Sequence, residues 1–234
     1  MSKRISTVAI IGPDGSGKST LIAHLERELS PRPRRIYMGV NPAATTHALP
    51  TTRFLWFVKK RLNKPLIDYE RMRLGDVKPP TRPKKLHKRV LADLKSTVFV
   101  ANRIGEEWYR QGISWLYQRR GAVVLFDRHF YLDHMMLKLT NPDQKRTLLA
   151  WRLHDYLIER LYPKPQLTLY LDAAPEILFA RKPEVPIERL AKMRHAYHQM
   201  RDLVPAFAVV DTSVSIEDML AQAKRAIAAA ASPA

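Results

Sequence analysis

The segment G-P-D-G-S-G-K-S-T at residues 12–20 has the residue types and spacing to bind the phosphates of a nucleotide. It fits the pattern G-x-x-x-x-G-K-S, whose glycines let the backbone curl until successive N–H groups point at phosphate oxygens. The lysine of this pattern reaches the terminal phosphates, and the hydroxyl after it helps to hold Mg²⁺. We therefore predict that this loop binds nucleotide phosphates and Mg²⁺ through Gly12, Gly15, Ser16, Gly17, Lys18, Ser19 and Thr20.

The sequence on either side of this loop has the context that a phosphate-binding loop needs. Residues 5–11 form a short apolar run that predicts a buried strand, and Leu21, Ile22, Leu25 and Leu29 follow at helical spacing. The start of that helix adds a positive dipole beside the phosphates. An ordinary glycine-rich turn before a helix is the alternative, and the strand–loop–helix order argues against it.

A second set of candidate site residues follows the apolar run at residues 122–126, and this run predicts a strand that is covered on both faces. Asp127 at its end could hold the water shell of the metal, so Ser19 and Asp127 are the predicted metal residues. Arg128 could clamp a phosphate, although a structural ion pair would also explain an Asp-Arg sequence. Asp172 ends another predicted strand, and we expect it to cap that strand rather than do chemistry. His129, His134 and His195 have no spacing that predicts a metal site.

Strands and helices alternate along the chain. Apolar runs predict strands at residues 5–11, 34–38, 122–126, 166–172 and 207–211. Helical spacing predicts helices at residues 53–62, 84–119 (with a break near Gly112), 142–161, 175–181, 187–203 and 216–231. Such alternation, with the glycine loop after the first strand, indicates an α/β fold, here a P-loop NTPase with a five-stranded parallel sheet and helices on both faces. Ligands of such folds bind at the carboxyl ends of the strands, where the glycine loop, Asp127, Arg128 and Asp172 all fall.

Composition limits the function classes. A chain of 234 residues is expected to form a single domain over residues 1–234, and the absence of cysteine excludes disulfides and thiolate sites. No apolar run is long enough to span a bilayer and no signal peptide is evident, so we expect a cytoplasmic protein. The net charge is +18, and residues 50–95 hold fourteen basic and four acidic residues, a net +10. This basic insertion favours anionic partners, nucleic acid or a membrane surface among them, unless it is simply solvated surface.

The chain resembles the thymidylate kinase family of P-loop nucleoside monophosphate kinases, with one gap. The resemblance is carried by the glycine loop with its Asp14 and by residues 99–103, 120–129, 179–182 and 209–213. It implies that Phe99 stacks on a nucleobase, that Arg103 hydrogen-bonds the base and that Arg128 grips the acceptor phosphate. It also implies a mobile lid over residues 181–189. From the residues alone, Phe99 could instead be a core aromatic, Arg103 a solvent-facing arginine and Arg181 a surface charge.

The chain departs from the family on the acceptor side. Residues 37–42 read Y-M-G-V-N-P and lack the arginine that normally holds the acceptor phosphate, and the lid is short. We therefore expect ATP-dependent phosphoryl transfer from a nucleotide donor to a small anionic acceptor, phosphorylated or sugar-containing. The predicted catalytic residues are Lys18, Asp14, Arg128 and Arg181, with Arg181 closing over the transferring group and Asp14 facing the acceptor, as base if it is an alcohol. A nucleotide-gated protein that contacts nucleic acid or an anionic membrane through residues 50–95 is the alternative, and a homodimer is left open.

Overall fold

The computed structural model describes residues 5–30, 32–39, 41, 44–45, 47–61, 86–142 and 149–231. Its centre is a sheet of five parallel strands in the order β2-β3-β1-β4-β5. The strands are β1 (Thr7–Ile11), β2 (Arg34–Tyr37), β3 (Val124–Asp127), β4 (Leu167–Asp172) and β5 (Phe207–Asp211). The predicted α/β fold and parallel sheet are confirmed.

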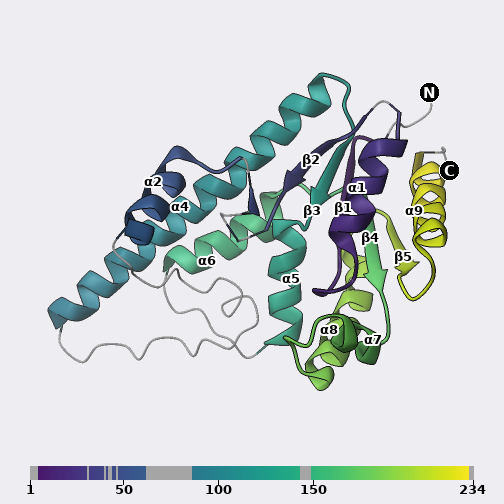
Figure 1. Cartoon of the computed structure of the whole chain (residues 1–234). Coiled ribbons are helices and arrows are strands. Elements are labelled where there is room, and N and C mark those ends of the chain that lie inside the picture. The colour runs from purple at the N-terminus through teal and green to yellow at the C-terminus, as the bar shows by residue number, and fades with distance from the viewer. Residues whose placement is uncertain are drawn as a thin grey trace.

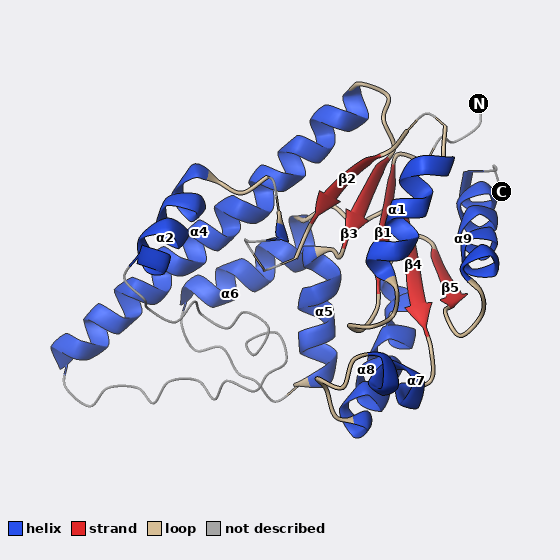
Figure 2. Ribbon diagram, in the orientation of Figure 1, coloured by secondary structure: helices blue, strands red, loops and turns tan. Residues whose placement is uncertain are grey.

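Helices cover both faces of the sheet (Figures 1 and 2). On one face lie α1 (Lys18–Glu28) and α9 (Ile216–Ala231), and on the other lie α4 (Leu86–Arg119), α5 (Phe130–Thr140) and α8 (Ile187–Gln199). The remaining elements are α2 (Pro50–Arg61), α6 (Leu149–Tyr156) with a π-helical turn (Leu157–Leu161), α7 (Pro175–Arg181) and a 3₁₀ turn (Met200–Leu203). No helix within these described ranges has the length and apolar character to cross a membrane.

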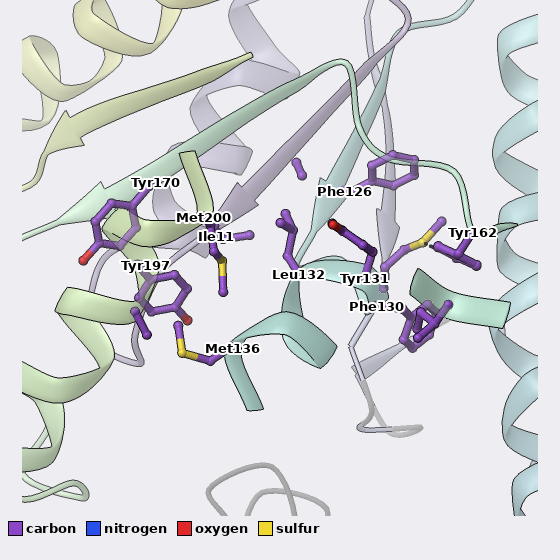
Figure 3. Packing of buried hydrophobic residues seen from close by; sticks show 14 of the residues in the cluster. Ile11, Phe126, Phe130, Tyr131, Leu132, Met136, Tyr162, Tyr170, Tyr197 and Met200 are labelled. Atoms are coloured by element: carbon purple, nitrogen blue, oxygen red, sulfur yellow. Dashed lines mark hydrogen bonds between the residues drawn. The ribbon is translucent and has the colours of Figure 1, made fainter. Parts of the chain in front are cut away.

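Successive side chains of β1 point to opposite faces of the sheet, so this strand contributes to a separate hydrophobic core on each face. Val8 and Ile10 pack toward α1 and α9, whereas Ala9 and Ile11 face the opposite core. Figure 3 shows that second core, in which aromatic and methionine side chains fill the space between the sheet, α5 and α8. All five residues of β1 are buried, so the strand that leads into the glycine loop is fixed from both faces.

Two helix expectations are corrected. The predicted break near Gly112 is wrong, because α4 runs without interruption from Leu86 to Arg119. A glycine costs an interior helix turn only about 1 kcal/mol, which the packing of so long a helix outweighs. The second correction is α5, which the sequence pattern did not reveal. Its first turns are buried on nearly all sides and show no clear polar stripe.

Some sequence expectations lie outside the described residues. They include residues 62–85, which form the middle of the basic 50–95 insertion, and residues 143–148 of the predicted 142–161 helix. The rest of that helix is observed as α6 and its π-helical turn. The glycine loop after β1, Arg128 after β3 and Asp172 at the end of β4 all lie at the carboxyl edge of the sheet.

Candidate nucleotide and phosphoryl-transfer site

The glycine loop between β1 and α1 has backbone geometry that other residues would not adopt. Gly12 has φ +151°, and a Cβ there would lie 2.7 Å from the Ser16 hydroxyl oxygen and 2.9 Å from the Leu171 carbonyl. Gly17 has φ +86° and forms the N-cap of α1. The loop therefore wraps tightly around the first turn of α1, whose free N–H groups point into it.

Lys18 lies inside this loop. Its side chain is buried, and Nζ donates hydrogen bonds to the carbonyls of Gly12 (2.9 Å) and Pro13 (2.6 Å). Burial, aided by the positive charge of Arg128, lowers the pKa of Lys18 to about 8. The Ser16 hydroxyl is buried with no hydrogen-bond partner among the described residues. A buried ammonium and an unpaired hydroxyl in a glycine cradle fit a phosphate group.

Asp14 and Arg128 meet over this loop. Arg128 Nη2 donates to Asp14 Oδ1 at 2.5 Å, and the Lys18 ammonium lies 3.8 Å from the same oxygen. Burial opposes ionisation of Asp14, but Arg128 and Lys18 outweigh it and lower the pKa of the carboxyl group. Arg128 also has φ +67°, the only positive φ of a non-glycine residue in the described chain. Such backbone strain costs about 1–2 kcal/mol and points to a position constrained by function.

Asp133 is a site residue that the sequence reasoning did not select. It lies in the first turn of α5. Its negative charge acts to raise the pKa values of Arg128, Lys18 and Tyr197, and Asp14 in turn acts to raise the pKa of Asp133. Its Oδ2 is buried without a hydrogen-bond partner in the described structure. Burial raises the pKa of Asp133 to about 6, despite the nearby Arg128 and Lys18. In the sequence, Asp133 could have been recognised only as an acidic residue five positions after Arg128. Its place near Arg128 becomes clear only when residues 130–140 are known to form a helix.

Asp127 has a partner that the sequence did not suggest. Arg35 on β2 contacts its Oδ2 at 2.5 Å, which holds this carboxylate at the end of β3. The predicted metal residues Ser19 and Asp127 both offer the hard oxygen atoms that Mg²⁺ prefers, and both lie beside the loop. They therefore fit Mg²⁺ in the type of ligand that they provide.

Phe99 and Arg103 lie on α4 and face α6. The rings of Phe99 and Trp151 have centroids 6.2 Å apart, and the Arg103 guanidinium lies 5.9 Å from the centroid of the same indole. Arg103 also donates to Glu107 at 2.9 Å. Both residues are thus engaged in the contact between α4 and α6, and a role at a nucleobase remains a prediction.

The predicted lid connects α7 to α8 beside the glycine loop. A Cβ at Gly15 would lie 3.3 Å from the Lys182 Cβ and 3.7 Å from the Arg181 Cβ. Arg181 donates to the carbonyl of Thr212 at 2.7 Å, so its guanidinium is held at the loop after β5. The charge of Lys182, in contrast, contributes to lowering the pKa of Asp14.

Asp172 has a structural role, as the sequence suggested. Arg194 forms two hydrogen bonds of 2.8 Å with its two oxygens, and the Tyr170 hydroxyl donates a third at 2.9 Å. These bonds tie α8 to the end of β4. The lid therefore leads into a helix that is anchored to the sheet.

Comparison with known proteins supports the fold. No family model and no curated protein matches the chain. Among solved structures, deoxyadenosine kinase from M. mycoides with bound dATP is 18% identical, with 94% of this chain and 97% of that chain covered and a TM-score of 0.53. The same enzyme with bound dCTP is 11% identical, with 95% and 99% covered and a TM-score of 0.48. At 18% identity the likeness to the dATP-bound structure shows the fold alone.

Proposed function

We propose that this protein transfers a phosphoryl group from ATP to a small phosphorylated or sugar-containing acceptor. The observation that carries the proposal is the meeting of Lys18, Asp14 and Arg128 over the glycine loop. Phosphoryl transfer depends on positioning and on neutralising charge more than on covalent chemistry. This site can supply both positioning and positive charge, because it brings together the loop N–H groups, the buried ammonium of Lys18 and the guanidinium of Arg128.

Each residue has a role that follows from its place. Lys18 would exchange its bonds to the loop carbonyls for bonds to the donor phosphates. Arg128, which contacts Asp14 over the glycine loop, would stabilise charge on the transferring group. Ser19 and Asp127 would hold Mg²⁺, which neutralises negative charge on the phosphates when it is bound.

Among acceptors, a hydroxyl group fits better than a phosphate. Two carboxylates, Asp14 and Asp133, lie close to Arg128, and each would repel a phosphate dianion bound beside it. Arg128, the cation between them, is already paired with Asp14. The low pKa of Asp14 makes it the weaker base, so Asp133 is the better candidate to accept the proton of an attacking hydroxyl. The fold neighbour described as a deoxyadenosine kinase makes nucleosides the first acceptors to test, with thymidylate as the phosphate-bearing comparison.

The pH dependence of kcat/KM should be bell-shaped with a maximum near pH 7. Asp133 acts as a carboxylate, so activity should fall as the pH drops below its pKa of about 6. Lys18 acts as an ammonium, so activity should fall as the pH rises above its pKa of about 8. Asp133→Asn should lower kcat by about 10²- to 10⁴-fold and abolish the acidic limb. The exposed Asp202→Asn serves as a control, and an acidic limb that persists in Asp133→Asn would rule out this role.

Arg181→Ala separates two roles of the lid arginine. If Arg181 closes over the transferring group, kcat should fall by at least about 10²-fold while KM for ATP changes little. If it only anchors the loop at Thr212, KM for ATP should rise with kcat unchanged. We expect the first result in steady-state kinetics, with Arg181→Lys intermediate because it retains the charge.

The proposal as a whole is tested by transfer of labelled phosphate from [γ-³²P]ATP. We expect a labelled product with at least one nucleoside, nucleotide or sugar. The alternative, a nucleotide-gated binding protein, predicts no transfer to small molecules but salt-sensitive binding to an oligonucleotide or anionic vesicles.

A further inference from the structure

Two histidines that are twenty positions apart in the sequence lie against each other away from the glycine loop. His134 is on α5 and His154 on α6, helices that neighbour each other in Figure 1, and their ring centroids are 5.9 Å apart. Both rings are buried, with 6% and 1% of their surface exposed. Asp155 Oδ1 lies 3.8 Å from His134 Nδ1 and 3.6 Å from His154 Nδ1. One ligand atom from each residue lies within 4.8 Å of the others.

The far nitrogen of each ring is held by a carboxylate. His134 Nε2 lies 2.9 Å from Glu159 Oε1, and His154 Nε2 lies 3.1 Å from both oxygens of Glu107. A neutral imidazole that donates its Nε2–H to a carboxylate directs the lone pair of Nδ1 to the other side. Metal-binding histidines are commonly oriented in this way, and the carboxylate also makes the ring a stronger ligand.

His154 Nδ1 is the atom that most requires a ligand. It is buried and has no hydrogen-bond partner among the described residues. Its distance of 3.6 Å from Asp155 exceeds that of a hydrogen bond. An unpaired buried nitrogen is costly, and a bound ion or water would satisfy it.

We propose that His134, His154 and Asp155 form a binding site for a divalent transition metal of the zinc type. Zinc bonds of about 2.0–2.2 Å at tetrahedral angles separate neighbouring ligand atoms by about 3.3–3.6 Å. The two observed distances to Asp155, 3.6 and 3.8 Å, therefore need to close by only a few tenths of an ångström, and all three ligand atoms already lie within 4.8 Å of one another. Two imidazoles with one carboxylate suit Zn²⁺ rather than Mg²⁺ or Ca²⁺, which prefer oxygen ligands.

The fourth position of such an ion has an open approach. A cavity of about 370 Å³ is lined by His134, Asp155 and Glu159, and its wall also carries the basic residues Lys138, Arg152 and Arg160. Water could complete the coordination from this cavity, and the basic wall would favour an anionic ligand in its place. Because His134 follows Asp133 directly, the ion would fix the start of α5 and with it the carboxylate on the other side.

Equilibrium dialysis of the metal-free full-length protein against Zn²⁺ tests the proposal. We expect one tightly bound Zn²⁺ per chain, a rise in melting temperature and, with Co²⁺ in its place, visible d–d absorption typical of a tetrahedral site. His154→Gln and Asp155→Asn should each weaken binding by about 100-fold or more. His87→Gln, which alters an exposed histidine of α4, should bind as the wild type does.

A second variant keeps the test valid if His154→Gln does not fold. Glu159 is partly exposed and lies behind His134, so Glu159→Gln should fold and weaken Zn²⁺ binding by about 10-fold. A proton is the competing occupant, since burial disfavours the charged ring but the carboxylates of Asp155 and Glu107 raise the pKa of His154. Wild-type protein that binds no stoichiometric Zn²⁺ and gives no cobalt absorption, or ligand variants that bind as the wild type does, would overturn the proposal.

Discussion

Lys18→Ala should lower the rate of phosphoryl transfer by about 10³-fold or more while the protein remains folded. The ammonium is the only cation inside the loop in the described structure, and its bonds to Gly12 and Pro13 place it where donor phosphates would lie. Removing one group that stabilises charge from a buried, preorganised position can cause a loss of this size. Folding should be spared, because burial depresses the pKa of Lys18 and the folded state therefore carries its charge at a cost below about pH 8. The melting temperature should stay the same or rise.

Lys224→Ala is the matched control for this experiment. Lys224 forms an exposed ion pair with Glu28 between α9 and α1, and surface pairs of this kind contribute little to stability. Its removal should leave turnover unchanged. If Lys18→Ala retained ATP-dependent transfer at a rate near that of the control, the site would be wrongly assigned.

Arg128→Ala and Arg128→Gly should both lose about 10³-fold in turnover but differ in stability. Both remove the guanidinium that contacts Asp14, so both lose its charge stabilisation of the transferring group. Only glycine relieves the positive φ of +67°. The glycine variant should therefore have a free energy of unfolding about 1 kcal/mol higher than the alanine variant.

Urea unfolding of the two Arg128 variants, followed by circular dichroism, measures this difference. The comparison isolates backbone strain, because the two variants differ by a single methyl group. A glycine variant less stable than the alanine variant would show that the strain is absent. Turnover near the wild-type level in either variant would show that Arg128 does not act on the transferring group.

Motifs with strict spacing were the parts of the candidate site that could be proposed from the sequence. The glycine loop and the Asp127–Arg128 pair were found because each follows an apolar strand, and parallel strands bring their carboxyl ends to one edge. Elements with strong periodicity, such as α7, α9 and β5, have the predicted bounds. Gly112 misled the prediction, because the cost of one glycine is small against the packing of a long helix.

Contacts between distant segments could not be predicted in this way. Asp133 was missed because α5 is buried on nearly all sides and lacks the polar stripe by which surface helices are recognised. Arg35 and Asp127 meet only through the pairing of β2 with β3. His134 was set aside because its spacing to other histidines had no meaning along the chain, whereas the packing of α5 near α6 brings it to His154.

The most direct test of the central claim is transfer of ³²P from [γ-³²P]ATP by the wild-type protein and Lys18→Ala, across nucleosides, thymidylate, sugars and an oligonucleotide. Our account predicts a labelled small-molecule product with the wild type, strongest for an acceptor with a free hydroxyl, and at least about 10³-fold less with Lys18→Ala. Equal labelling by both proteins, or no labelled product from any acceptor, would contradict it.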